Sequence, residues 1–484
     1  MSAHPLPTST PAAEGVDARG VHAFLDAVES APDLEPHSLM ILRHGRLIAS
    51  GWWAPYTAER PHLLYSLSKS FTSTAAGLAA AEGLLNLDDP VISYFPEFEA
   101  EITDPRSRAM LVRHVASMAS GHIEETVDRA FGLDPEEPVR GFLLLPPDRE
   151  PGTVFAYNQP ATYTLAAIVQ RVTGQSLTEY LRPRVFDPLG IGETAWLQVP
   201  AGRDLGFSGL FATTDAIARL GLLYLRGGEW EGERLLPASW VDEATRLRMP
   251  TEEAMVNGAG PDWRRGYGFQ FWISRHGYRG DGAYGQFCVV LPEHDVVIAT
   301  TADTERMQAI LDAVWEHLLP AFGDAPLTGR EDEDAALERR LSRLALPPLA
   351  AKAAPLSDPG AWSGAEFAPE GGACPDQPTL TGVTVAEDGS GGWSVSLAEE
   401  GSRLDLGFDA AGWRVHTGPE APVPTAVSGG WTDPDTLTVD VAFLETPHHL
   451  VVTCSLAERV FTARWRTMPL HRAPLHVMRA PRPR

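Results

Sequence analysis

Ser66 and Lys69 are residues whose types and spacing suggest chemistry, and they lie in the stretch LLYSLSKSF, residues 63–71. Residues three positions apart share one face of a helix, so a helix starting here would place the hydroxyl beside the amino group. A buried lysine can lose its charge and then accept the proton of a neighbouring hydroxyl. The pair is therefore a candidate nucleophile with its base.

The lysine itself is unusual in this chain. Lys69 and Lys352 are the only lysines, so 37 of the 39 basic residues are arginines. Arginine cannot release its proton in a protein, so it could not replace Lys69 as a base. A GC-rich genome explains the general shortage of lysine, and a chance S-x-x-K match is the alternative to a catalytic pair.

Tyr157, Asn158 and Gln159 form a second candidate group. They lie in PGTVFAYNQPATYTLAAIVQRVTG, residues 151–174, where the pattern predicts a turn followed by a helix that ends at Gly174. A tyrosine hydroxyl can relay a proton if cationic neighbours lower its pKa. The alternative is a buried structural tyrosine in front of a helix.

Asp281, Gly282, Ala283 and Tyr284 form a third group, in the glycine-rich stretch YRGDGAYGQFCVVLP of residues 278–292. Glycine lets backbone N–H groups approach a substrate carbonyl closely, so this stretch could contribute half of an oxyanion hole. A tight hairpin turn without a catalytic role is the alternative.

The surrounding pattern predicts an α+β domain over residues 1–330. Apolar stretches predict a hairpin at 38–53 and three strands between residues 267 and 302, with helical patterns between them. Strands at both ends of this domain would pair into one antiparallel sheet flanked by helices. The helix-rich interval of about 85–205 is predicted to form an all-helical subdomain.

The C-terminal part of the chain has a different composition. Residues 331–355 begin with a charged helical stretch and continue with one rich in proline and alanine, and they are predicted to form a linker. Residues 356–484 alternate apolar and polar side chains between turn signals. This pattern predicts an all-β domain of roughly seven or eight antiparallel strands in a barrel or sandwich.

The composition argues against several classes of partner. The formal net charge of -25 disfavours nucleic acid and anionic membranes, and no run of about 18 apolar residues exists that could span a bilayer. Three widely separated cysteines predict neither a disulfide framework nor a metal site. Because the N-terminus lacks a signal-peptide pattern, we expect a cytoplasmic protein. We also expect neither a cofactor nor a metal ion.

The three groups together resemble the motifs of class C β-lactamases and penicillin-binding-protein-like serine hydrolases, in which S-x-x-K carries the nucleophile. Flanking stretches agree. LVRHVASMASGH at residues 111–122 resembles the family's IRHLLSHTSG, and GFSGLFATTDAIARLG at 206–221 resembles its GGLYSTARDLARFG. The resemblance covers about residues 15–325 and implies the family's α+β fold.

By this resemblance, Ser66 would be the acylated nucleophile, Lys69 its activating neighbour and Tyr157 the proton shuttle. The backbone N–H of Ser66 and one from Gly282–Tyr284 would form the oxyanion hole. The C-terminal β domain resembles the lipocalin-like or small-barrel domains appended to some family members. The implied activity is hydrolysis of a small-molecule ester or amide through an acyl-enzyme.

Two positions depart from the family's pattern. The family has Tyr-x-Asn, whereas here Gln159 occupies the third position and Asn158 lies beside it. Asp281-Gly282-Ala283 stands where the family has Lys-Thr-Gly or His-x-Gly, whose basic residue attracts a substrate carboxylate. An aspartate there would repel one, so we expect a neutral or cationic acyl substrate, unless Asp281 turns away to cap the turn.

Two other functions fit the same residues. The acyl-enzyme could be captured by an amine, as in acyltransferases or in penicillin-binding-protein-type thioesterases that release or cyclise peptides. The altered third motif also leaves open a non-catalytic binding protein on this fold. The rare lysine beside Ser66 and Tyr157 argues against that last alternative.

Overall fold

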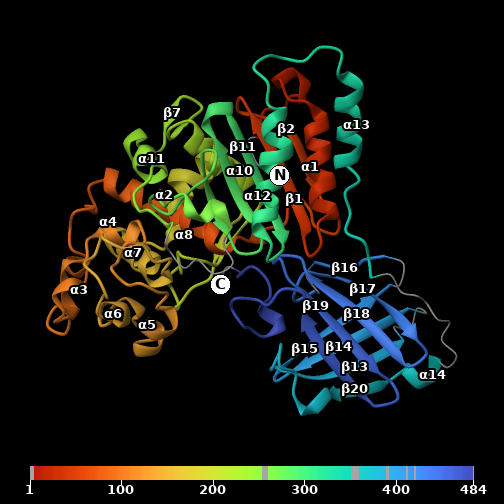
Figure 1. Ribbon diagram of the computed structural model, residues 1–484. Helices are drawn as coiled ribbons and strands as arrows, with labels where there is room; N and C mark the ends of the chain where they lie inside the picture. Colours follow the sequence, from red (N-terminus) through yellow and green to blue (C-terminus); the bar gives the residue numbers. More distant parts are fainter. Residues whose placement is uncertain are drawn as a thin grey trace. The chain divides into compact units, whose positions relative to one another are not determined.

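The computed structural model describes residues 5–252, 260–349, 359–387, 392–409, 412–418 and 421–482. The chain divides into two compact units, in which red to green ribbons form most of the first and blue ribbons most of the second (Figure 1). The first unit comprises the residues up to Gly51 together with Leu63–Ser342, and the second comprises Trp52–His62 together with Arg343–Arg482. The second unit therefore includes a short segment from the N-terminal part of the chain.

The first unit contains the predicted antiparallel sheet, which has six strands. Their order is β2-β1-β11-β10-β9-β8, so the N-terminal hairpin pairs with strands from the end of the domain. Strand β1 runs beside β11 with Ile41 opposite Ile298. The bounds are β1 Glu35–Arg43, β2 Arg46–Trp52, β8 Trp272–Ile273, β9 Tyr278–Gly282, β10 Gln286–Leu291 and β11 Val296–Asp303.

Both faces of this sheet are covered. All eight residues of β11 are buried, and successive residues of a strand point to opposite faces. Helix α10, Thr214–Leu225, packs on β1, β10 and β11, while α1, Ala18–Ser30, packs on β1 and on α12, Met307–Ala313. Coverage on both sides explains why β11 reads as a nearly continuous apolar run rather than an alternating one.

Between β2 and β8 the chain is mainly helical, as predicted by its pattern. Helix α7 ends at Gly174, whose φ of 67° provides a left-handed C-cap. Among the described residues, no helix is both long and apolar enough to cross a membrane. The remaining helices here are α2 Ser68–Ala81, α3 Pro105–Ala109, α4 Val112–Ala116, α5 Val127–Leu133, α6 Pro138–Leu143, α7 Gln159–Thr173, α8 Leu177–Leu181, α9 Asp187–Leu189 and α11 Ala238–Thr245. Short strands are β3 His62–Leu63, β4 Ala195–Trp196, β5 Leu210–Ala212, β6 Glu229–Trp230 and β7 Glu233–Arg234.

Helix α13, Glu331–Leu341, occupies the first part of the interval that the sequence predicted as a linker. It belongs to the first unit and packs on α1. The segment is helical, as its pattern predicted, and the buried Leu337 and Leu341 lie four residues apart in an apolar stripe. Residues 350–358, which include the end of the predicted linker and the predicted start of the β domain, lie outside the described residues.

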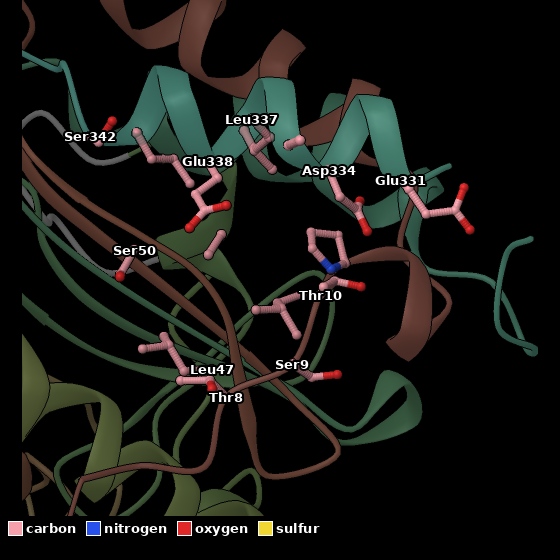
Figure 2. A pocket seen from close by; sticks show the side chains of 15 residues that line it. Thr8, Ser9, Thr10, Leu47, Ser50, Glu331, Asp334, Leu337, Glu338 and Ser342 are labelled. Carbon is pink, nitrogen blue, oxygen red and sulfur yellow. The ribbon is translucent and has the colours of Figure 1, made fainter. Parts of the chain in front are cut away.

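A groove of about 680 Å³ lies between α13, β2 and residues 8–11 (Figure 2). Asp334, Leu337 and Glu338 extend from α13 toward Leu47 and Thr10. The groove is at the β2 edge of the sheet, whereas Asp281 and Gly282 lie on β9, near the opposite edge. It is therefore separate from the candidate residues.

The second unit contains one nine-stranded sheet that curls into a nearly closed barrel, with a core that includes Trp431 and Trp465. Strand β12 pairs antiparallel with β13 and parallel with β20, so the sheet is mixed rather than wholly antiparallel as predicted. It has nine strands, where the sequence predicted roughly seven or eight. The bounds are α14 Pro359–Trp362, β12 Ala365–Pro369, β13 Leu380–Glu387, β14 Trp393–Glu399, β15 Ser402–Phe408, β16 Arg414–His416, β17 Thr425–Asp433, β18 Thr436–Phe443, β19 His449–Ser455 and β20 Val460–Trp465.

Candidate active site

Ser66 lies in a tight turn between β3 and α2. Tyr65–Leu67 form a single 3₁₀ turn, and Tyr65 has a left-handed φ of 48°. This conformation is uncommon for a residue with a large side chain, and it persists only where the surroundings hold it. The turn leaves Ser66 half-buried at the entrance to α2, three residues before Lys69.

Strand β9 packs directly on this turn because it carries glycine at two alternate positions. A Cβ on Gly282 would lie 2.0 Å from Leu64 O, and a Cβ on Gly280 would lie 2.5 Å from Ser70 Oγ. Both distances are too short for any side chain, so only glycine permits this approach. The end of β9 is thereby held against the backbone that precedes and follows Ser66.

The amino group of Lys69 has three oxygen neighbours. Nζ lies 3.0 Å from Ser66 Oγ, 2.6 Å from Gln159 Oε1 and 2.8 Å from Phe207 O. The Tyr157 ring lies beside the group, with its centroid 4.7 Å from Nζ. Three segments distant in sequence therefore meet at Lys69, which is only 1% exposed.

The pKa of Lys69 is strongly lowered. Burial lowers it to about 7, although the negative charges of Glu125 and Asp281 oppose this change. Removing an ammonium group from water disfavours its charged form. Near neutral pH, a large fraction of Lys69 is therefore an uncharged amine.

The Phe207 carbonyl is placed by the loop that runs along α2. Thr72, on the same helix face as Lys69, donates a hydrogen bond of 2.8 Å to the preceding carbonyl, Gly206 O. A Cβ on Gly206 would lie 2.3 Å from Ala166 Cβ, and its φ is 70°. Glycine at this position lets the loop pass between α2 and α7.

Tyr157 lies in the turn before α7, where the sequence placed it. Its hydroxyl is hydrogen-bonded to Ser66, and its ring stacks on Trp272 with a centroid distance of 5.3 Å. Cationic neighbours do not dominate its surroundings, because desolvation raises the pKa of Tyr157 and the charge of Asp281 raises it further. Tyr157 is therefore a protonated phenol rather than a phenolate.

Gln159 and Asn158 are adjacent in sequence but have different surroundings. Gln159 begins α7, and its side-chain oxygen contacts Lys69. Asn158 is fully buried, and its Oδ1 accepts hydrogen bonds from the backbone N–H and the hydroxyl of Thr126 at 3.0 and 2.9 Å. The structure therefore brings Gln159 to the lysine and uses Asn158 in the packing of the helical region.

Asp281 is buried in an ion pair, which neither sequence-based alternative anticipated. Arg279 Nε donates to its carboxylate at 2.9 Å, and Trp272 contributes a further side-chain hydrogen bond. Desolvation raises the pKa of Asp281, and the positive charge of Arg279 opposes this rise. The sequence contained a signal for the pair, because residues two apart on a strand share a face.

Glu125 is a neighbour of the site that the sequence reading missed. Its carboxylate accepts the backbone N–H of Gln159, and its charge acts on Lys69. No motif or spacing links residue 125 to residue 69, because their proximity depends on how the helical region folds back onto α2.

Comparisons with known proteins show which family the chain belongs to. The Beta-lactamase family model matches residues 28–318. The 6-aminohexanoate-dimer hydrolase of Paenarthrobacter ureafaciens is 29% identical over 303 residues, which cover 57% of this chain and 76% of that protein. The lovastatin esterase of Penicillium rubens is 29% identical over 196 residues, which cover 36% of this chain and 49% of the esterase.

A solved structure has a similar fold. EstCE1, described as a hydrolase with promiscuous acyltransferase activity, superposes with a TM-score of 0.51 at 19% identity, covering 62% of this chain and 99% of EstCE1. The α+β fold of the first unit is thus one that known hydrolases share. Since the family model matches more than half of the chain, this protein belongs to the β-lactamase family of serine hydrolases.

Proposed function

We propose that this protein hydrolyses a small ester or amide through an acyl-enzyme on Ser66. The surroundings of Lys69 carry this proposal. Gln159 Oε1 and Phe207 O are acceptors, so an uncharged Lys69 donates its two N–H bonds to them. The remaining lone pair of Nζ then faces Ser66 Oγ at 3.0 Å, in position to take the hydroxyl proton.

In the proposed reaction, Ser66 Oγ attacks the acyl carbon while its proton moves to Lys69. The carbonyl oxygen becomes negative and is stabilised by the N–H of Ser66 and one N–H of Gly282–Tyr284. The proton then passes from Lys69 through the Tyr157 hydroxyl to the leaving group as the bond to that group breaks. Water releases the acyl group by the reverse sequence and regenerates Ser66.

The relatives support a small-molecule substrate, since they are named as a 6-aminohexanoate-dimer hydrolase and a lovastatin esterase. Acyl transfer is the second candidate, favoured by the fold shared with EstCE1, a hydrolase with promiscuous acyltransferase activity. Both reactions proceed through the same acyl-enzyme, and they differ only in whether water or an amine accepts the acyl group.

Intact-protein mass spectrometry tests the nucleophile. After incubation with a fluorophosphonate or p-nitrophenyl esters, the wild type is expected to gain one adduct and Ser66→Ala none, because Ser66 Oγ is the hydroxyl that lies 3.0 Å from Lys69 Nζ. Adding an amine acceptor and assaying for the amide separates transfer from hydrolysis. Equal labelling of Ser66→Ala would refute the nucleophile, and a wild type that never acylates would favour a binding protein on this fold.

The charge of the acyl group is expected to affect the rate. Asp281 and Glu125 place negative charge near Lys69, while Arg279 is already paired with Asp281. Among p-nitrophenyl esters of equal length with cationic, neutral or anionic acyl ends, we expect kcat/KM for the anionic ester to be at least about tenfold below that of the neutral one. Equal values at low ionic strength would contradict this assignment.

A further inference from the structure

Two turns that are distant in sequence bind one another at the start of α7. Glu125 accepts the backbone N–H of Gln159 with both carboxylate oxygens, each at 3.1 Å. In the opposite direction, Asn158 Oδ1 accepts the N–H and the hydroxyl of Thr126. We call these four contacts the 125–159 latch.

The latch supplies a hydrogen-bond acceptor for the start of α7. The first N–H groups of a helix have no partner within the helix, and they favour a negative charge. Asn158 is the N-cap of α7, yet its side chain makes no capping hydrogen bond to that helix. Glu125 provides the acceptor instead, and it also accepts the N–H groups of Thr126 and Val127 at 2.8 and 3.0 Å.

Gln159 connects the latch to the catalytic lysine, because its side-chain oxygen lies 2.6 Å from Lys69 Nζ. We propose that Glu125 is a positioning residue, which fixes Gln159 through the latch and thereby directs the lone pair of Lys69 at Ser66. This inference rests on the proposed function, since it concerns the base of that reaction. A shift of α7 away from α2 would remove one of the two acceptors that orient the amine.

Glu125 also acts through its charge. Lys69 faces the Tyr157 phenol from the turn before α7, Asp281 with its partner Arg279 from β9, and Glu125 from the segment before α5. The two carboxylates favour the charged amine and raise its pKa, whereas burial lowers it. Loss of the charge at residue 125 is therefore expected to lower the pKa of Lys69, so that activity extends to lower pH.

Two substitutions of Glu125 distinguish its positioning of Gln159 from the effect of its charge on Lys69. Glu125→Gln keeps an oxygen acceptor and removes the charge, so we expect its kcat/KM at high pH to stay within about threefold of the wild type while the acidic limb moves to lower pH. Glu125→Ala removes the acceptor as well, and a misplaced catalytic group costs on the order of 100-fold. Glu124→Gln is the matched control, because Glu124 is the neighbouring exposed glutamate and pairs with Arg129 instead of Gln159; its profile should equal that of the wild type.

The pKa of Lys69 can also be measured without any substrate. In protein labelled with ¹³C at the lysine ε-carbon, only Lys69 and Lys352 give signals, and Lys352→Arg identifies them. Lys69 is expected to titrate at about 7, and Glu125→Gln to lower that value by roughly half to one pH unit. The control Glu124→Gln should leave it unchanged.

These measurements distinguish a failure of the proposed role of Glu125 from a failure of the proposed function. An unchanged Lys69 titration in Glu125→Gln, together with an unchanged rate in Glu125→Ala, would overturn the role of Glu125 even if Ser66 is acylated. A wild type that never acylates would refute the proposed function. The titration would then still decide whether Glu125 acts on Lys69.

Discussion

Replacing Lys69 with arginine is expected to slow the acylation of Ser66 at neutral pH by about 1,000-fold. The wild-type amine is uncharged over much of the neutral range because burial lowers its pKa to about 7. A guanidinium keeps its proton at any accessible pH, so it offers no lone pair to Ser66. Stopped-flow release of p-nitrophenol from an excess of enzyme measures this step directly.

The chain supplies its own control for this substitution. Lys352→Arg makes the same chemical change at the only other lysine and is expected to leave the acylation rate unchanged. Raising the pH should not restore the acylation rate of Lys69→Arg. A Lys69→Arg enzyme within tenfold of the wild type would show that another group removes the proton.

Gly282→Ala is expected both to destabilise the fold and to slow the acylation of Ser66. The new Cβ would lie 2.0 Å from Leu64 O and 3.1 Å from Leu67 N, so β9 must move away from the turn that holds Ser66. Overpacking of this kind costs about 1–3 kcal/mol of folding free energy, and displacement of an oxyanion donor costs on the order of 100-fold in rate. Urea unfolding and single-turnover acylation measure the two effects.

Gly132→Ala is the matched control for this prediction. Gly132 lies in α5 and has open space around the position of an added Cβ, and alanine is the better helix former. We expect unchanged acylation and unchanged or slightly higher stability. If Gly282→Ala behaved in the same way, close packing of β9 on the Ser66 turn would not be what positions the site.

Local features of the site could be predicted from the sequence. The spacing of Ser66 and Lys69 predicts that their side chains lie together, although Ser66 is in the turn that precedes α2. Gly174 marks the end of α7 because a left-handed C-cap favours glycine. The approach of Glu125 and of the Phe207 carbonyl to Lys69 could not be predicted in this way. These contacts join segments that no short-range pattern relates, and a backbone carbonyl leaves no signature in residue type.

The ion pair of Asp281 had a signal that sequence reasoning could have used. Arg279 stands two residues before Asp281 on a strand, so the alternation of faces already placed the two charges together. By contrast, the parallel pairing of β12 with β20 joins a five-residue strand to one near the end of the chain, and only the packed barrel determines it.

The segment Trp52–His62 has a consequence for how such proteins evolve. It belongs to the second unit, where Ala54 exchanges backbone hydrogen bonds with Leu344 and Leu346 and the Tyr56 hydroxyl donates to Thr446 O. Yet it ends only a few residues before Ser66. Recombination that deletes or exchanges the barrel at Ser342 would leave this segment without its packing partners, a few residues before the nucleophile. Where the barrel is present, residues 52–62 are therefore expected to coevolve with it rather than with the domain whose sequence surrounds them.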